Sequence, residues 1–330
     1  MRAPLIDSFG RVHTDLRVSL TDRCNLRCRY CMPEEGLPWL PRGDTLTADE
    51  IVRLVRIGAE RLGIRSVRLT GGEPLLRRDL VEVVGHLAAI DPPIELAMTT
   101  NAVGLDKVAS PLKEAGLARV NISLDTLRRD RFSQLTHRDR LAHVLNGIEA
   151  AKAAGLDPVK INAVLMRGVN DDEIVDLARF AVASGCQVRF IETMPLDAQS
   201  DWSRAAVVTA DEIMARLEEE FTLEQVDGDA SAPATVWRIA GTDARVGVVA
   251  SVTRAFCSDC NRVRLTADGQ LRNCLFANDE TDLRALLRSD VDDETIEGAW
   301  RACIADKARG HGINDVHFQQ PLRPMSAIGG

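Results

Sequence analysis

Short apolar runs alternate with longer segments of helical periodicity from about residue 12 to residue 225. This alternation is typical of repeated βα units, whose strands lie parallel in one sheet. Six apolar runs predict strands, at residues 15–20, 66–70, 94–99, 119–124, 159–165 and 187–192. Six units are two short of a closed eight-stranded barrel. The pattern therefore favours an α/β fold, an incomplete (βα)6 barrel of the TIM type, with a doubly wound sheet as the alternative.

Polar and glycine residues mark the ends of the predicted helices. Gly155 and Gly185 stand shortly before predicted strands and predict helix ends. Three polar pairs spaced three residues apart predict N-cap and N3 positions: Thr47 with Glu50, Asn170 with Glu173 and Thr209 with Glu212.

The pattern changes after a turn-rich stretch at residues 227–233. Residues 310–330 lack a hydrophobic period and predict an extended tail. Between these two stretches the pattern predicts strands at 235–239 and 246–252 and helices near 281–288 and 292–308. We therefore expect a partial barrel over residues 1–225 and a C-terminal region over 226–330.

Charge and cysteine content restrict the function classes. The 330 residues include 41 basic and 49 acidic side chains, a net charge of -8, so the surface repels polyanions and nucleic acid is not expected as a partner. No apolar run resembles a signal peptide or a membrane span. We expect a cytoplasmic protein with no membrane partner, whose eight cysteines serve metal or redox chemistry rather than disulfides.

Three cysteines, Cys24, Cys28 and Cys31, can converge on one soft metal centre. A [4Fe-4S] cube held by three thiolates leaves one iron open for a substrate or cosubstrate. The alternatives are buried free thiols and part of a zinc site. Polar neighbours such as Asp22 and Arg23 are unsuited to a core, and no fourth Cys or His lies near in sequence to close a structural zinc site. We therefore favour a catalytic iron–sulfur cluster.

A second trio, Cys257, Cys260 and Cys274, lies in the C-terminal region. By itself its spacing also suits half of a zinc ribbon. Cys186 and Cys303 are the remaining candidates for a fourth ligand, but both stand in apolar patterns that predict core positions. If neither contributes, this centre is also open, which favours a second [4Fe-4S] cluster over zinc.

Basic residues accompany these cysteines. Arg262 and Arg264 alternate in an extended segment beside the second trio, so their side chains point to the same side. Two guanidiniums there suit an anionic ligand such as a polyphosphate. Parallel strands rarely carry charge without a function, yet four predicted strands contain basic residues: Arg17, Arg68, Lys160 and Arg189. We expect these four to share one pocket.

Two further patterns concern ligands. Gly71 and Gly72 end the second strand, where they allow close backbone approach to a ligand; a simple βα turn is the alternative. No P-loop pattern is present in the sequence, so a nucleotide would be held differently. The six histidines show no metal spacing and predict surface or packing positions.

At these residues the sequence resembles the radical S-adenosylmethionine superfamily, through Cys24-x3-Cys28-x2-Cys31 and the segment Gly71-Gly72-Glu73-Pro74. More narrowly, it resembles the GTP 3',8-cyclase family of molybdenum cofactor biosynthesis. That narrower resemblance covers essentially the whole chain and rests on the second trio, on Asn261-Arg262-Val263-Arg264 and on the terminal Gly329-Gly330. It implies two [4Fe-4S] clusters facing each other across one cavity.

The implied reaction turns GTP into (8S)-3',8-cyclo-7,8-dihydroguanosine 5'-triphosphate through a 5'-deoxyadenosyl radical. The resemblance implies that S-adenosylmethionine binds at the first cluster and is contacted by Tyr30, Gly72, Ser123 and Met194. It implies GTP contacts from Arg17, Arg68, Thr99, Lys160, Arg189, Arg262, Val263 and Arg264. It assigns catalytic roles to Arg17, Arg262, Arg264, Gly329 and Gly330.

Some points stay open at this level. Ser66 stands where family members often carry Lys, and the terminal glycines have a frayed end as their alternative. The implied partners are GTP, an electron donor and a downstream pterin-forming enzyme, and the chain is either a monomer or a homodimer. Rival interpretations are a radical S-adenosylmethionine peptide maturase with an auxiliary cluster, and a non-enzymatic metal-binding module.

Overall fold

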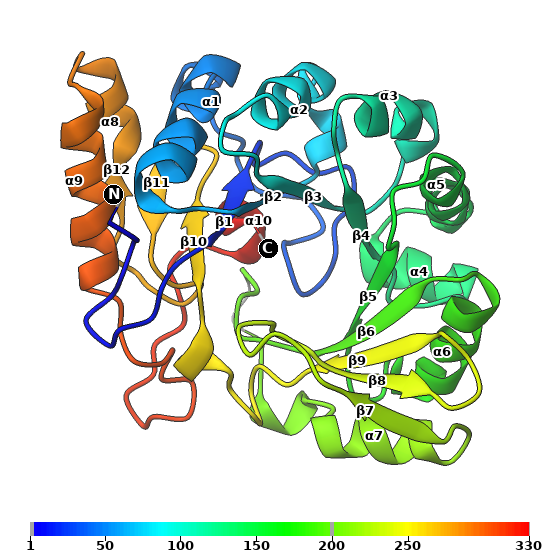
Figure 1. Ribbon diagram of the computed structural model, residues 1–330. Helices are drawn as coiled ribbons and strands as arrows, with labels where there is room; N and C mark the ends of the chain where they lie inside the picture. Colours follow the sequence, from blue (N-terminus) through cyan, green and yellow to red (C-terminus); the bar gives the residue numbers. More distant parts are fainter. Residues whose placement is uncertain (1–2, 199–200, 330) are drawn as a thin grey trace.

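The structure, a computed structural model, describes residues 3–198 and 201–329. Its centre is one twelve-stranded sheet that curves into an open barrel (Figure 1). The six predicted strands form the middle of this sheet, in chain order and parallel to their neighbours. They are β1 (Asp15–Ser19), β2 (Ser66–Thr70), β3 (Glu95–Thr100), β4 (Arg119–Ser123), β5 (Lys160–Leu165) and β6 (Gln187–Glu192). The predicted partial barrel is confirmed.

The C-terminal region extends both edges of this sheet. β9 (Arg245–Val249) lies parallel to β6, and β10 (Arg262–Leu265) lies parallel to β1. Antiparallel strands follow outside them: β8 (Thr235–Ile239) and β7 (Leu223–Val226) on one edge, β11 (Gln270–Arg272) and β12 (Thr281–Asp282) on the other. β7 and β12 end the strand order, so in the described chain the barrel stays open. The division at residue 225 remains a prediction, since strands from both sides of it share this sheet.

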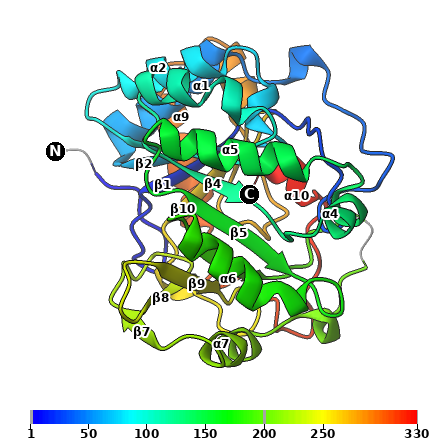
Figure 2. The same ribbon diagram turned by 90° about the vertical axis from the view of Figure 1, so that its right-hand side faces the viewer.

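Helices cover the outer face of the sheet (Figures 1 and 2). Those of the βα units are α1 (Ala48–Ile57), α2 (Leu80–Ala88), α3 (Ala109–Glu114), α4 (Arg129–Thr136), α5 (Leu141–Ala153), α6 (Ile174–Ala183) and α7 (Ala210–Glu218). α8 (Leu283–Arg288) and α9 (Asp293–Ala305) follow β12. One-turn segments are η1 (Arg42–Asp44), η2 (Gly58–Leu62), η3 (Pro74–Leu76), η4 (Leu105–Lys107), η5 (Asp171–Glu173), η6 (Arg204–Ala206) and η7 (Cys257–Asp259). No helix of the described residues combines the length and apolarity of a membrane span.

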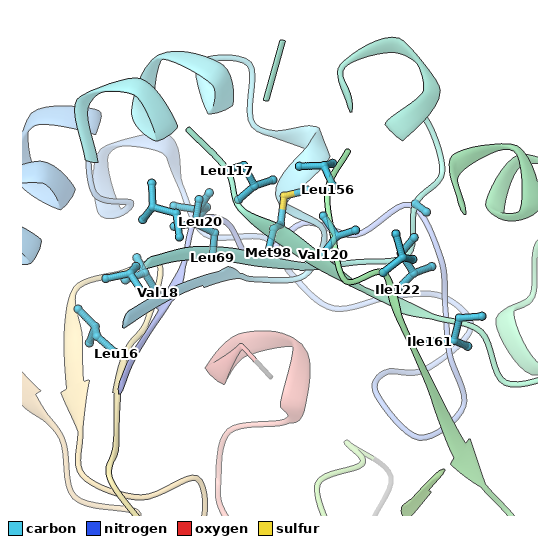
Figure 3. Close-up of a cluster of buried hydrophobic side chains, with 14 of the residues drawn as sticks. Leu16, Val18, Leu20, Leu69, Met98, Leu117, Val120, Ile122, Leu156 and Ile161 are labelled. Carbon is cyan, nitrogen blue, oxygen red and sulfur yellow. The ribbon is translucent and has the colours of Figure 1, made fainter. Parts of the chain in front are cut away.

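Alternation along each strand separates a core face from a cavity face. Val18, Leu69, Met98 and Val120 are buried on the side of the sheet that faces the helices (Figure 3). The neighbouring residues of each strand point into the barrel, because successive side chains of a strand take opposite faces of the sheet. The inner face is therefore lined by side chains that the hydrophobic core excludes.

Most predicted helix boundaries are confirmed. Thr47 with Glu50 and Thr209 with Glu212 form capping boxes, and Gly155 and Gly185 adopt positive φ after their helices. Asn170 stands at the N-cap position of η5, but its side chain makes no capping hydrogen bond. The Asn170 side chain instead donates to the carbonyls of Asp125 and Val164, at 2.8 and 2.9 Å, and accepts from the Met166 amide at 2.8 Å.

The tail differs from its prediction, because its end forms a helical turn inside the barrel. α10 (Met325–Ile328) lies within the curve of the sheet (Figure 1). Ser326 and Ile328 are buried, so the tail is packed up to Gly329. Gly330 lies outside the described residues.

Candidate active site

Two adjoining cavities, each of about 190 Å³, occupy the inside of the barrel. The first cavity is lined by Cys24, Cys28 and Cys31, and the second by Cys257, Cys260 and Cys274. The residues that line both cavities are Thr99, Asn162, Ile191, Met194 and Met325. Because they share this wall, the two cysteine trios face one chamber.

The loop of the first trio follows β1 and is held by the glycines that end β2. The Gly72 amide donates to the Thr21 carbonyl and the Glu73 amide to the Arg23 carbonyl, both at 2.7 Å. A Cβ on Gly72 would stand 2.4 Å from the Arg23 oxygen, which is too close for any side chain. These glycines therefore permit close approach to the cysteine loop as well as to the cavity that both line.

Glu73 links the loop of the first trio to the end of β3. Its buried carboxyl group accepts hydrogen bonds from the Thr100 hydroxyl and the Asn101 amide, each at 2.7 Å, and burial raises its pKa to about 7. The Asn101 side chain donates to Asn25 Oδ1 at 2.7 Å and lies 3.9 Å from Cys24 Sγ. Sequence reasoning missed Asn101, whose only signal is its position directly after β3.

The four residues expected to contact S-adenosylmethionine come together at the first cavity. Tyr30, Gly72, Ser123 and Met194 all line it. The Tyr30 hydroxyl donates to Asp125 Oδ2 at 2.8 Å, and Asp125 Oδ1 accepts from the Val164 amide at 2.8 Å. Burial raises the pKa of Asp125 to about 6. Asp125 was not predicted, although it follows β4 at the end where parallel strands present ligand-binding residues.

The second trio is surrounded by cationic side chains. Arg262 lies 4.8 Å from the centre of the Phe256 ring, and the buried Lys307 ammonium lies 3.5 Å from Cys260 Sγ and 2.8 Å from the Arg262 carbonyl oxygen. Burial alone would raise the pKa of Cys260, but Arg262 and Lys307 lower it to about 6. These cations favour a thiolate at Cys260, which is the form that binds metal.

Asp7, Arg11, His13 and Lys307 form a hydrogen-bond network, here called the N-terminal clamp, that holds Lys307 beside Cys260. Lys307 Nζ lies 3.4 Å from His13 Nδ1, and His13 Nε2 lies 3.0 Å from Asp7 Oδ2. Asp7 also accepts from Arg11 Nε at 2.5 Å, and Arg11 donates to the Cys257 carbonyl at 2.7 Å. The clamp ties residues near the start of the chain to the second trio, and nothing in the sequence pattern predicts it.

Two of the six histidines lie near the second trio, in different roles. Burial lowers the pKa of His13 to about 4, and His13 packs in the clamp as a packing residue. His311 lines the second cavity, with Nε2 3.1 Å from the Ser251 carbonyl oxygen. A lone histidine without metal spacing carries no sequence signal for this position.

Strand register gathers the predicted basic residues. Arg17 stands opposite Arg68 on one side and Arg264 on the other. The second cavity is lined by six of the predicted substrate residues: Arg17, Arg68, Thr99, Arg189, Arg262 and Arg264. Of the four basic strand residues expected to share one pocket, all but Lys160 do so.

Two predicted substrate residues lie elsewhere. Lys160 lines neither cavity; its pKa falls to about 7 because of burial and the nearby Arg189. Val263 is fully buried in the core, since it alternates with the two inward-facing arginines. Its contact with a ligand through the side chain is not supported. Ser66 pairs in register with Asp15 and Glu95, at the start of the strands.

Among the described residues, four of the five arginines of the second cavity form no ion pair, and Arg17 pairs with Asp15 alone. No carboxylate lines this cavity among the described residues, and Asp15 lies 3.8 Å from Arg17. Burial lowers the pKa of Arg189 to about 10 and that of Arg264 to about 9. In the part of the chain that the structure describes, Arg17 Nε, Arg68 Nε and Arg262 Nη2 are buried without hydrogen-bond partners. Buried guanidiniums are costly unless an anion joins them, so this cavity suits a polyanion.

The C-terminal tail contacts strands β1, β2 and β10 on the inside of the barrel. The Gly329 carbonyl accepts a hydrogen bond from Arg264 Nη1 at 2.9 Å. Its φ is +84°, and a Cβ there would lie 2.7 Å from Thr70 Oγ1 and 2.9 Å from Ser19 Cβ. Only glycine suits this position.

The remaining cysteines do not join either trio. Cys186 and Cys303 are buried in the core, as predicted. Within the described residues no three His, Cys, Asp or Glu side chains surround a single-ion position. The two trios offer thiols only, the donor chemistry of iron–sulfur clusters.

Nearly all of the chain is similar to known proteins. Residues 18–181 match the family described as Radical SAM superfamily, and residues 186–313 match Molybdenum Cofactor Synthesis C. The chain is 59% identical over 328 residues to the GTP 3',8-cyclase of Streptomyces coelicolor, covering 99% of this chain and 96% of that protein. It is 56% identical over 332 residues to GTP 3',8-cyclase 2 of Mycobacterium tuberculosis (strain H37Rv), with coverage of 99% and 92%.

Solved structures are more distant. Streptococcus suis SuiB bound to S-adenosylmethionine superposes with a TM-score of 0.62 at 15% identity, covering 96% of this chain and 77% of that one. SuiB bound to the precursor peptide SuiA gives a TM-score of 0.56 at 14% identity, with coverage of 96% and 76%. At this identity the similarity concerns the fold alone.

Proposed function

Because the chain belongs to the GTP 3',8-cyclase family, we propose that it converts GTP to (8S)-3',8-cyclo-7,8-dihydroguanosine 5'-triphosphate, an early step of molybdenum cofactor biosynthesis. The observation that carries the proposal is the second cavity, where two buried and three partly buried arginines meet a cysteine trio without any carboxylate in the described lining. A triphosphate supplies the missing negative charge.

Radical SAM enzymes use S-adenosylmethionine and a [4Fe-4S] cluster, and Cys24, Cys28 and Cys31 are the residues that would hold this cluster. When bound, the pair supplies a one-electron cleavage that yields methionine and a 5'-deoxyadenosyl radical. We propose a second [4Fe-4S] cluster on Cys257, Cys260 and Cys274. The thiol donor set, and the cations that favour a thiolate at Cys260, support it.

The side chains of the chamber bind, orient and exclude water. Arg17, Arg68 and Arg189 bind the triphosphate, while Arg262 and Arg264 hold the nucleotide beside the second trio. Tyr30, Gly72, Ser123 and Met194 position S-adenosylmethionine in the first cavity. Ile191, Met194 and Met325 line the shared wall, so apolar groups surround the space between the two ligands and protect a radical from solvent.

The terminal glycines act through Arg264. The Gly329 carbonyl fixes the Arg264 guanidinium, and the catalytic role of Gly330, which lies outside the described residues, is part of the same proposal. Because the tail lies inside the barrel, it also narrows the chamber.

The test is an anaerobic incubation of purified protein with GTP, S-adenosylmethionine and dithionite. We expect 5'-deoxyadenosine and a cyclised nucleotide in equal amounts. Formation of 5'-deoxyadenosine without any change in GTP would contradict the proposal. A peptide substrate has only the 15%-identical fold in its favour, so we do not propose one.

The proposal also implies a setting. The protein would work in the cytoplasm, which its eight free cysteines support. It would receive electrons from a donor and pass its product to a pterin-forming enzyme. Both a monomer and a homodimer are compatible with it.

A further inference from the structure

A groove of about 550 Å³ lies on the outside of the loop that carries the first cysteine trio. Its walls come from the start of this loop, from the segment that leads into α1 and from the segment that leads into α2. Four arginines line it, against two aspartates: Arg23, Arg42, Arg77 and Arg78, with Asp22 and Asp79.

The two aspartates of the groove are already engaged. Asp79 accepts two hydrogen bonds from Arg77, at 2.8 and 3.1 Å. Asp22 Oδ2 accepts from the Leu40 amide at 2.6 Å, and Asp22 is buried. Arg77 is itself fixed, because it also donates to the carbonyls of Leu20 and Leu46.

The other three arginines are free to meet a partner. Arg23, Arg42 and Arg78 are exposed, and across residues 3–198 and 201–329 their guanidiniums form no ion pair or hydrogen bond. Leu76, beside them, is an exposed apolar side chain. Arginine next to apolar surface is typical of protein interfaces.

Only two backbone segments separate this groove from the first cavity. Thr21 and Arg23 line the groove, while Gly72 and Glu73 line the cavity, and the two pairs are joined by hydrogen bonds of 2.7 Å. Arg23 is also bonded directly to Cys24. An electron that arrives at the groove therefore has a short covalent and hydrogen-bonded path to the first trio.

We propose that this groove docks the electron donor, a small acidic protein with a low-potential one-electron cofactor. The proposal rests on the proposed function. The net charge of the chain is -8, so an acidic donor is repelled by the surface as a whole and attracted only by a local basic patch. Electron-transfer complexes are small and transient, which suits a groove of this size.

The electron balance is simple. The reduced donor loses one electron and leaves oxidised by one electron. The proposed cyclisation takes two electrons per turnover, so two reduced donor molecules are oxidised. The first electron breaks one carbon–sulfur bond of S-adenosylmethionine and yields methionine and a 5'-deoxyadenosyl radical, which becomes 5'-deoxyadenosine when it takes a hydrogen atom from GTP. The second electron, with one proton, reduces the cyclised nucleotide radical to the dihydro product.

The test compares two reductants on the iron-loaded protein under anaerobic conditions. The variant is Arg23→Glu/Arg42→Glu/Arg78→Glu, and the probe is photoreduced bacterial flavodoxin. We expect flavodoxin-driven 5'-deoxyadenosine formation to fall about tenfold or more at low salt, while the dithionite-driven rate stays at the wild-type level. Added salt should slow the wild type and leave the variant unchanged.

The matched control is Arg56→Glu/Arg65→Glu/Arg245→Glu, which changes the net charge equally at exposed arginines outside the groove. Equal losses in both triple variants, or no loss in either, would overturn the docking proposal. If the glutamate variant loses its iron, Arg23→Gln/Arg42→Gln/Arg78→Gln replaces it in the same comparison. Failure of the wild type with dithionite would instead count against the proposed function.

Discussion

The two cavities of the chamber differ in charge although they share a wall. Glu73 and Asp125 line the first, and no arginine or lysine does so among the described residues. Five arginines and no described carboxylate line the second. A cosubstrate with a sulfonium and an ammonium group suits the first environment, and a triphosphate suits the second. On the proposed function, the opposite charges of the two cavities would therefore orient the two ligands by electrostatics.

The cysteine loops also differ in how they are held. Backbone hydrogen bonds and a tight glycine contact hold the first, whereas buried charged side chains of the N-terminal clamp hold the second. A backbone contact fixes position without adding charge. A nearby cation also stabilises added electrons, so the second site combines position with electronic tuning.

The largest predicted effect separates the two trios. Cys28→Ser should abolish 5'-deoxyadenosine formation, because the radical source is lost. Cys260→Ser should retain it and lose only the cyclised nucleotide. Chromatography measures the two products. Iron analysis should give about eight irons per chain in the wild type and about four in either variant. Loss of both products in both variants would remove the distinction between the trios.

The next effect tests the basic cavity. Arg262→Ala/Arg264→Ala removes two charge-assisted contacts, each of about 1.5–3 kcal/mol, so GTP should bind about 100-fold more weakly or worse. S-adenosylmethionine affinity should not change. Calorimetry with both ligands measures this, with the exposed pair Arg216→Ala/Arg238→Ala as control. Unchanged GTP affinity would refute the assignment of the second cavity.

The tail gives a third test. Gly329→Ala places a Cβ against Thr70 and Ser19 at a positive φ, a strain of about 1–3 kcal/mol that displaces the carbonyl from Arg264. Cyclisation should slow by about tenfold or more, while both clusters assemble. Gly298→Ala in α9, where a Cβ meets nothing within 4 Å, should keep full activity. Equal activity of the two variants would make the tail a passive end.

The smallest effect concerns the clamp. Lys307→Met removes a cation 3.5 Å from Cys260 Sγ, so the reduction potential of the second cluster should become more negative, because the reduced form loses a stabilising charge. The EPR signal of the first cluster should stay unchanged. Redox titration followed by EPR measures both, with exposed Lys107→Met as control. A shift confined to the first cluster would contradict the clamp's role.

Local patterns predicted the six central strands, two of the C-terminal strands and the cysteine trios, since all of these depend on short spacings; the short strands β7, β11 and β12 were not predicted. The partners of the C-terminal strands were not predictable, because pairing of β9 with β6 and β10 with β1 joins residues far apart in sequence. The side chain of Asn170 does not cap η5, because a tertiary site competes for it. Lys307, His311 and Asp125 stand alone in sequence, so no spacing marks them; register and burial bring them to the site.

The placement of β9 and β10 at the two flanks of β1 to β6 constrains synthesis of the protein. While the ribosome is still adding residues beyond β6, β1 and β6 both expose unpaired edges, which are sites of intermolecular pairing. Neither edge can pair until β9 and β10 have been synthesised, and both strands lie more than fifty residues beyond the end of β6. The nascent chain therefore depends on slow long-range pairing, and chaperone holding during that interval should raise the yield of folded protein.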